Sequence, residues 1–72
     1  MYSLVGIDGN AFNIMGYVTN AMREQRMPKK DRDAYCERAM SGDYDNLIYE
    51  SMLVIDQLNE KLDPDYDGEE DW

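Results

Sequence analysis

Histidine is absent from this 72-residue chain, and cysteine occurs once, at Cys36. A single cysteine cannot form an internal disulfide, and one thiol without imidazole groups does not supply the usual ligands of a zinc or iron site. The same absence removes the commonest activator of a thiol nucleophile. We therefore expect Cys36 to be a small buried or half-buried helix residue, and we expect neither a metal nor a cofactor.

Basic residues are scarce, because seven lysines and arginines stand against sixteen aspartates and glutamates, for a formal net charge of -9. Binding to DNA, RNA or anionic lipid needs a surplus of positive charge that displaces counterions. The composition therefore argues against a direct nucleic-acid partner and against membrane binding. It favours a protein partner with a basic surface.

Long apolar runs are missing as well, so neither a signal peptide nor a membrane span is predicted. We expect a cytoplasmic protein. With 72 residues the chain is one domain at most, near the size at which one core is marginal, and a homodimer stays open. Such a chain has little room for the concave, partly dry site that carboxylate catalysis requires, so we expect no enzymatic activity.

The first third of the chain carries turn and helix signals. Residues Tyr2 to Ile7 are a short apolar run that favours an extended segment packed on the rest. Residues 8–10 (DGN) supply a turn and a helix cap, and a helix is expected to about Gln25. Its apolar side chains recur at helical spacing, at Ala11, Ile14, Met15, Val18 and Met22. Gly16 costs about 1 kcal/mol relative to alanine in mid-helix, so we expect another group to approach it closely.

Two further helices are predicted after Met27. The second has Pro28 in its first turn and runs to about Met40. Its buried face is expected to contain Tyr35, Cys36, Ala39 and Met40. Gly42 would end this helix in the left-handed conformation, and Asp43 or Asp45 would cap the next one. The third helix is expected from about Asn46 to Leu62.

The apolar positions of the third helix cover more than one stripe, which is wider than a three-helix core needs. They are Leu47, Ile48, Met52, Leu53, Val54, Ile55, Leu58 and Leu62. Tyr49 and Leu53 are therefore candidates for a second contact, with self-association as the simplest explanation. After Pro64 the chain is too acidic to fold alone. The fold prediction is mainly α: a small three-helix bundle at residues 1–62, with a short extended N-terminal segment, followed by a disordered acidic tail at 63–72.

The tail has three interpretations. Residues 63–68 (DPDYDG) resemble the opening of an EF-hand calcium loop, but the glutamate required at its twelfth position would fall beyond Trp72, so we assign no metal site. Residues 69–72 (EEDW) resemble the C-terminal tips of bacterial and phage single-stranded-DNA-binding proteins, which dock in basic pockets of replication and repair enzymes. A solubilising segment is the third interpretation.

Carboxylates that flank aromatic side chains are the candidate protein-binding residues. They are Asp43, Tyr44, Asp45, Asp65, Tyr66, Asp67, Glu69, Glu70, Asp71 and Trp72. Tyr44 and Tyr66 are expected to be exposed and to suit a protein interface. We expect three further tyrosines to line the edge of the core: Tyr17, Tyr35 and Tyr49.

Six of the seven basic residues lie between Arg23 and Arg38, mixed with four carboxylates. A solvated face with ion pairs within helices is one interpretation. The other is an anion-binding or nucleotide-phosphate patch around the predicted loop, formed by Arg23, Arg26, Lys29, Lys30 and Arg32. The same patch could instead dock the acidic tail, in the same chain or in a second copy.

Two sequence motifs carry a family resemblance. Residues 8–16 (DGNAFNIMG) and 41–47 (SGDYDNL) resemble short uncharacterised bacterial and bacteriophage proteins with the patterns DGNAF-x-x-MG and SGDYD-x-L. The resemblance spans roughly residues 8–58 and implies a phage or prophage origin rather than an activity. If a phage encodes the protein, we expect it in the host cytoplasm. Residues 27–28 and 41–43 are also similar in placement to loops of the three-helix CUE and UBA domains, which supports the helical topology alone.

These observations together predict a small acidic phage-type protein that binds a host protein as an inhibitor or modulator. The carboxylates of the third helix (Asp45, Glu50, Asp56 and Glu60) and the tail could imitate the phosphate spacing of nucleic acid and occupy a basic cleft. One alternative is an oligomer that sequesters a nucleotide or second messenger at the basic patch. Another is a structural or assembly accessory protein that self-associates through Tyr49 and Leu53.

Overall fold

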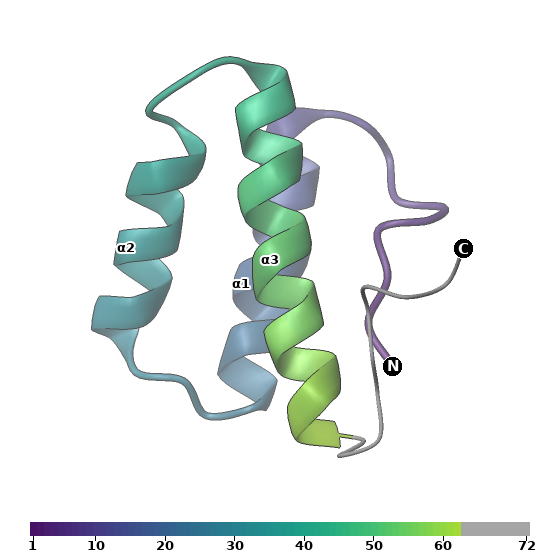
Figure 1. Cartoon of the computed structure of the whole chain (residues 1–72), viewed down its shortest axis with the longest axis vertical. Coiled ribbons are helices and arrows are strands. Elements are labelled where there is room, and N and C mark those ends of the chain that lie inside the picture. The colour runs from purple at the N-terminus through teal and green to yellow at the C-terminus, as the bar shows by residue number, and fades with distance from the viewer. Residues whose placement is uncertain (63–72) are drawn as a thin grey trace.

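The computed structural model describes residues 1–62, which form three helices and no strand. The helices are α1 (Ala11–Glu24), α2 (Lys29–Ala39) and α3 (Tyr44–Leu62), and each packs against the other two. The α1–α2 loop lies at one end of the bundle, and the α2–α3 loop lies at the other, close to the start of α1 (Figure 1). The three-helix bundle predicted from the sequence is therefore confirmed.

The start of α1 is fixed by side-chain capping, as the DGN signal predicts. The Asn10 side-chain oxygen accepts a hydrogen bond from the Phe12 N–H at 2.8 Å. Asp8 in turn accepts one from the Asn10 N–H at 3.1 Å. These bonds satisfy amide groups that would otherwise have no partner at the first turn.

The end of α1 has an unusual residue in the left-handed conformation. Arg26 has a φ of 61°, and it follows the C-cap residue Gln25. The Met27 N–H bonds to the Met22 carbonyl and the Arg26 N–H to the Arg23 carbonyl, both at 2.9 Å. This is the Schellman pattern, in which glycine normally occupies the left-handed position. Arginine stands there at an energetic cost, because its Cβ crowds the backbone.

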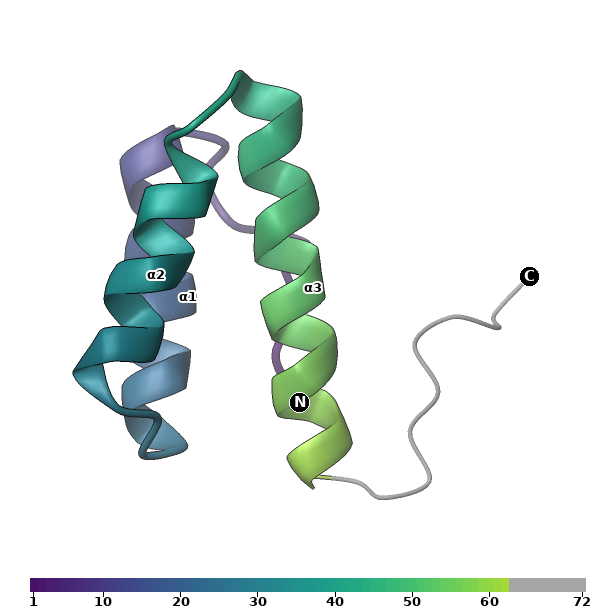
Figure 2. The same cartoon turned by 60° about the vertical axis from the view of Figure 1, so that its left-hand side comes forward.

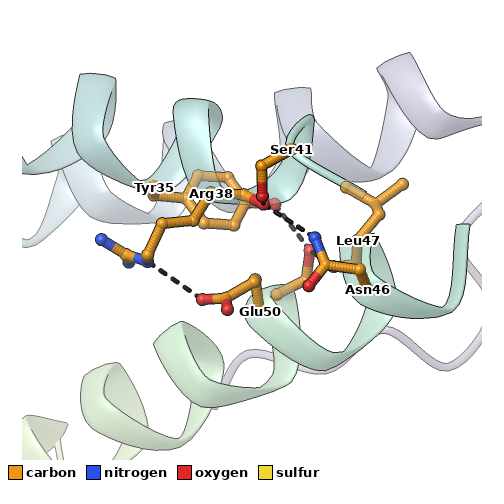
Figure 3. A network of polar contacts seen from close by, with 7 residues as sticks. Tyr35, Arg38, Ser41, Asn46, Leu47 and Glu50 are labelled. Carbon is orange, nitrogen blue, oxygen red and sulfur yellow. Dashed lines mark hydrogen bonds and ion pairs between the residues drawn. The ribbon is translucent and has the colours of Figure 1, made fainter. Parts of the chain in front are cut away.

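The link between α2 and α3 differs from the predicted glycine stop. Gly42 is not among the residues with positive φ, so that prediction is wrong. Side chains satisfy the end of α2 instead, because the Arg38 carbonyl accepts bonds from Ser41 Oγ and Asn46 Nδ2, both at 2.7 Å (Figure 3). A Cβ at position 42 would lie 3.0 Å from the Asn46 Cβ. Position 42 therefore favours glycine because a Cβ would crowd Asn46, and not because the backbone has a positive φ there.

The cap of α3 is Asp43, one of the two predicted candidates. Its carboxylate accepts a hydrogen bond from the Asn46 N–H at 2.9 Å. The helix consequently begins at Tyr44, two residues before the predicted start. The Arg38 side chain bonds Glu50 at 3.0 Å and adds a second tie between α2 and α3 (Figure 3).

The core is built from all three helices. Its buried apolar residues are Ile14, Val18, Ala21, Met22, Tyr35, Ala39, Leu47, Val54, Ile55 and Leu58. Met40 was predicted to be buried but is 63% exposed, because α2 ends before it and its side chain lies outside the helix packing. Tyr49 was placed at the core edge but is 60% exposed, on the face of α3 turned to solvent.

The predicted width of the apolar surface of α3 is borne out by its exposed residues. Met52, Leu53 and Leu62 are 54%, 42% and 46% exposed. The prediction for Gly16 is wrong, because no group lies within 4 Å of a Cβ built there and the residue faces solvent. Gly16 therefore has no packing reason to be glycine.

Two fully buried hydroxyl groups lie within the core, on Tyr35 of α2 and Ser51 of α3. Their oxygens are 2.6 Å apart, and Ser51 Oγ also donates to the Leu47 carbonyl at 2.7 Å. Since a serine hydroxyl has one proton, the Tyr35 hydroxyl is the donor to Ser51. Burial raises the Tyr35 pKa above the usual tyrosine value, because the low-polarity core disfavours the phenolate.

The N-terminal segment, residues 1–7, runs beside α3 toward the start of α1 (Figures 1 and 2). We call it the strap. Asn59 holds it by accepting from the Tyr2 N–H at 2.8 Å and donating to the Tyr2 carbonyl at 3.0 Å. Tyr2 and Leu4 are half-buried against the core, whereas Ser3 and Val5 face outward. This alternation fits the predicted extended segment as far as Leu4. Residues 4–7 turn instead, because the Ile7 N–H bonds the Leu4 carbonyl at 3.2 Å and Gly6 has a φ of 85°.

Candidate protein-binding site

Three carboxylates and a tyrosine meet at the end of the bundle where α1 and α3 begin and α2 ends. The Tyr44 hydroxyl donates a 2.6 Å hydrogen bond to the Gly9 carbonyl, across 35 residues of sequence. This bond places the loop before α1 against the start of α3. Asp8, Asp43 and Asp45 are all exposed there. We call these three residues the acidic end.

A hollow of about 280 Å³ opens at the same end of the bundle. Its wall is largely apolar and combines residues of all three helices and the α2–α3 loop: Ala11, Met15, Ala39, Met40, Gly42, Asp43, Tyr44 and Leu47. We call it the terminal hollow. Met40 is 63% exposed and Tyr44 is 48% exposed, so two large side chains of this wall are accessible to a partner.

The carboxylates of the acidic end also stabilise the helices. Asp43 caps α3, and Asp45 lies in its first turn. Asp8 precedes α1 and supports its cap residue Asn10. Negative charge at a helix N-terminus offsets the partial positive charge of the helix dipole. These carboxylates therefore stabilise the starts of α1 and α3, and their exposed oxygens remain accessible to a partner.

The predicted protein-binding residues divide into two groups. Asp43, Tyr44 and Asp45 lie together at the acidic end, as described above. The others, Asp65, Tyr66, Asp67, Glu69, Glu70, Asp71 and Trp72, lie outside the described residues, as do the predicted disordered tail and the calcium-like segment.

The predicted anion-binding residues surround the α1–α2 loop at the opposite end of the bundle. Arg23, Arg26, Lys29 and Lys30 are exposed, and Arg32 is half-buried. Lys29 pairs with Asp33 at 2.7 Å, with 76% and 63% of the two side chains exposed. Such a solvated pair contributes little to stability. A cavity of about 240 Å³ beside the loop has Asp31 and Arg38 in its wall rather than any of the five predicted residues.

The carboxylates of α3 do not form one uniform row. Glu50 is turned toward α2, where Arg38 holds it, and its side chain is 16% exposed. Asp45 and Glu60 are exposed, and Asp56 is half-buried. The regular phosphate-like spacing envisaged from the sequence is therefore interrupted at Glu50.

Cys36 is half-buried in α2, as expected from the sequence. Burial raises its thiol pKa, and the negative charge of Asp33 raises it further. A raised pKa leaves less of the reactive thiolate near neutral pH. Within residues 1–62, no three or more histidine, cysteine or acidic side chains are grouped so that they could hold a metal ion.

Sequence reasoning identified the charged part of this site but missed its apolar part. Met15 and Met40 were both assigned to the core, and no pattern in the sequence connects them with Tyr44. The nearest signal was the width of the apolar surface, which predicts some exposed apolar side chains without locating them.

Comparison with known proteins finds no match among protein-family models, curated proteins or solved structures. Among the helices at residues 1–62, none combines the length and the apolar character needed to cross a membrane. The site therefore has to be interpreted from its own geometry and chemistry.

Proposed function

We propose that this chain is a binding protein that docks on a basic surface of another protein through the terminal hollow and the acidic end. The observation that carries the proposal is the contact between Tyr44 and Gly9, which brings the loop before α1 to the start of α3. Asp43 lines the apolar hollow there, and Asp8 and Asp45 are exposed next to Gly9 and Tyr44 in the sequence. An apolar side chain of the partner would enter the hollow, and neighbouring lysines or arginines would meet Asp8, Asp43 and Asp45.

The two parts of the site have different roles in this mechanism. Burial of Met40, Tyr44 and the inserted side chain supplies affinity, because apolar area leaves water. The carboxylates attract a basic partner over several ångströms and reject acidic ones. With a net charge of -9, the whole chain adds to this attraction, and salt weakens it.

The biological setting is proposed from the motif resemblance to short bacterial and bacteriophage proteins. In that setting the partner is a bacterial host protein, and the chain acts as a competitor rather than as a catalyst. A host enzyme that binds nucleic acid has a basic cleft of the kind this surface fits. The acidic residues beyond position 62 would extend the contact by charge alone.

The proposal is tested by affinity capture from a bacterial lysate, with retained proteins identified by mass spectrometry. The baits are the full chain, a chain that ends at Leu62, and two variants of the site, Met40→Asp and the double variant Asp8→Asn/Asp45→Asn. Asp33→Asn is the matched control, because it removes one exposed carboxylate of α2 whose ion pair with Lys29 is solvated.

We expect one basic protein that the full chain, the Leu62-ended chain and Asp33→Asn retain and that both site variants lose. Retention should fall as salt rises from about 0.05 to 0.5 M. Capture by the full chain alone would move the binding element to residues 63–72. Capture that is unaffected by the site variants and by salt would refute the proposed site.

A further inference from the structure

A second apolar groove runs along α3 on the side where the strap lies. It has a volume of about 450 Å³ and is lined by Tyr2, Ser3, Leu4, Val5, Ile48, Met52, Ile55, Asp56 and Asn59. One wall is α3 and the other is the strap, which follows the helix in both views (Figures 1 and 2). We call it the strap groove.

The strap groove is long and parallel to a helix. Its α3 wall contains residues at positions 48, 52, 55 and 59, which share one stripe of the helix. This stripe extends for about 16 Å, or three helical turns. Its rim is accessible, because Val5 is 90% exposed and Met52 is 54% exposed.

The strap wall is held in place rather than free to close over the groove. Asn59 binds both backbone groups of Tyr2, as described above. The Tyr2 hydroxyl donates to Glu24 at 2.7 Å and accepts from Gln25 at 3.1 Å. These bonds tie the strap to α1 and α3 at the same time.

The polar groups of the strap also restrict what kind of ligand the groove can take. Tyr2 uses its N–H and carbonyl on Asn59, and the Ser3 N–H donates to the Tyr17 hydroxyl at 3.0 Å. A ligand strand would need such backbone groups free for ladder pairing. The groove therefore recognises side chains rather than a backbone edge.

The charge around the groove is negative. Asp45 lies one turn before Tyr49 on the outer face of α3, and Asp56 and Glu60 follow further along the same face. The helix contains one basic residue, Lys61. A second copy of the chain would bring the same carboxylates opposite one another. The segment 63–72 carries six carboxylates and no basic residue, so it too has the wrong charge.

We infer that the strap groove binds a basic amphipathic helix of a partner protein. Apolar side chains of that helix, spaced at i, i+4 and i+7, would enter the groove between Val5 and Met52. Lysines or arginines on the side of this apolar ridge away from the strap would face Asp45 and Glu60. The inference rests on the proposed protein-binding function, and it adds a second surface and the class of partner segment that this surface accepts.

The test uses a synthetic helix of about 18 residues, long enough for the three turns of the groove, with leucines on one face and lysines elsewhere. Binding of the fluorescently labelled peptide to the full chain is measured by anisotropy. Two control peptides replace all lysines by glutamates or all leucines by serines. The groove variants are Val5→Asp and Met52→Asp. Phe12→Asp is the matched control, because Phe12 is an exposed apolar residue of α1 that lines neither hollow, and Met40→Asp reports any binding at the terminal hollow.

We expect the leucine–lysine peptide to bind and both control peptides to fail. Each groove variant should weaken binding by at least about tenfold, because an apolar contact becomes a buried charge. Phe12→Asp should change it by less than about twofold. All of the replaced side chains are largely exposed, so the variants should keep the helical circular-dichroism spectrum of the parent chain.

Several results would overturn the inference. They are the absence of peptide binding, equal binding by the groove variants, and loss of binding in Met40→Asp alone. A tenfold gain on ending the chain at Leu62 would assign the groove to the chain's own segment. A concentration-dependent dimer that Val5→Asp dissociates would assign it to a second copy. Failure of this test leaves the lysate result on the terminal hollow unaffected, so the two proposals are separable.

Discussion

The hydroxyl groups of Tyr35 and Ser51 form a one-way relay through the core, from Tyr35 to Ser51 and from Ser51 to the Leu47 carbonyl, over distances of 2.6 and 2.7 Å. Both side chains are completely buried. The direction of these bonds matters, because it decides whether a substitution leaves the remaining hydroxyl without an acceptor. Tyr35 depends on Ser51 as its acceptor, whereas Ser51 keeps its own acceptor without Tyr35.

The relay predicts unequal effects of two small substitutions. Ser51→Ala leaves the buried Tyr35 hydroxyl without an acceptor and should lower the free energy of unfolding by about 1–3 kcal/mol. Tyr35→Phe removes the donor as well as the bond and should cost about 1 kcal/mol or less. Urea denaturation measures both. The double variant should cost less than the sum of the single ones, and simple additivity would contradict the relay.

Alkaline pH should destabilise the fold through Tyr35. Burial raises the pKa of Tyr35 in the folded state, while the unfolded chain has the usual tyrosine pKa of about 10. The stabilisation by the neutral hydroxyl is therefore fully present below about pH 10 and is lost as pH rises through the higher pKa of the folded state. Thermal melts between about pH 8 and 11 should show a steeper alkaline decline for the parent chain than for Tyr35→Phe. Equal slopes would rule Tyr35 out as the cause.

Arg26→Gly should stabilise the protein. Arg26 has a φ of 61°, a conformation that glycine adopts without crowding. We expect the free energy of unfolding to rise by about 0.5–1 kcal/mol, after the extra flexibility of glycine in the unfolded chain is subtracted. Arg26→Ala is the control, because it removes the charge and keeps the strain. A gain of the same size in the alanine variant would assign the effect to charge.

Two glycine replacements should act in opposite directions. Gly16→Ala adds a methyl group to an open helix surface and should stabilise by about 0.5–1 kcal/mol. Gly42→Ala places a Cβ 3.0 Å from the Cβ of Asn46, whose amide is anchored on the Arg38 carbonyl. The crowding should cost about 1–2 kcal/mol. Melting temperatures that shift in the same direction would contradict this packing.

Asn59→Ala should release the strap. The substitution removes two hydrogen bonds to Tyr2 and should lower the free energy of unfolding by about 1–3 kcal/mol. The Tyr2 amide should then exchange with deuterium much faster than in the parent chain. Gln57→Ala, at an exposed position of α3, is the control. If Tyr2 stays protected in Asn59→Ala, other contacts hold the strap.

Local sequence signals predicted the helices well, because caps and apolar periodicity act within a few residues. Asn10 and Asp43 start α1 and α3 through bonds to amides two and three residues away. Features that depend on distant neighbours were predicted poorly. The role of Gly42 depends on where Asn46 packs, and the exposure of Gly16 depends on which face of α1 the other helices cover.

The candidate site was likewise predicted in its local features and missed in its long-range contacts. Aspartates flanking Tyr44 indicated a binding surface from composition alone. The hollow beside them exists because Tyr44 reaches Gly9, and the strap groove exists because Asn59 holds Tyr2 across 57 positions. No local pattern encodes either contact. Both contacts depend on how the three helices and the strap pack together in space.

The bond between Tyr2 and Asn59 joins residues separated by 57 positions, so the strap is made well before the residue that holds it. During synthesis at roughly 5–20 residues per second, about 3 to 11 s pass before Asn59 follows Tyr2. In that interval α1 and α2 are made without most of their core partners in α3. The apolar strap therefore has no partner on α3 until that helix has left the exit tunnel, and it is accessible to chaperones on the ribosome until then.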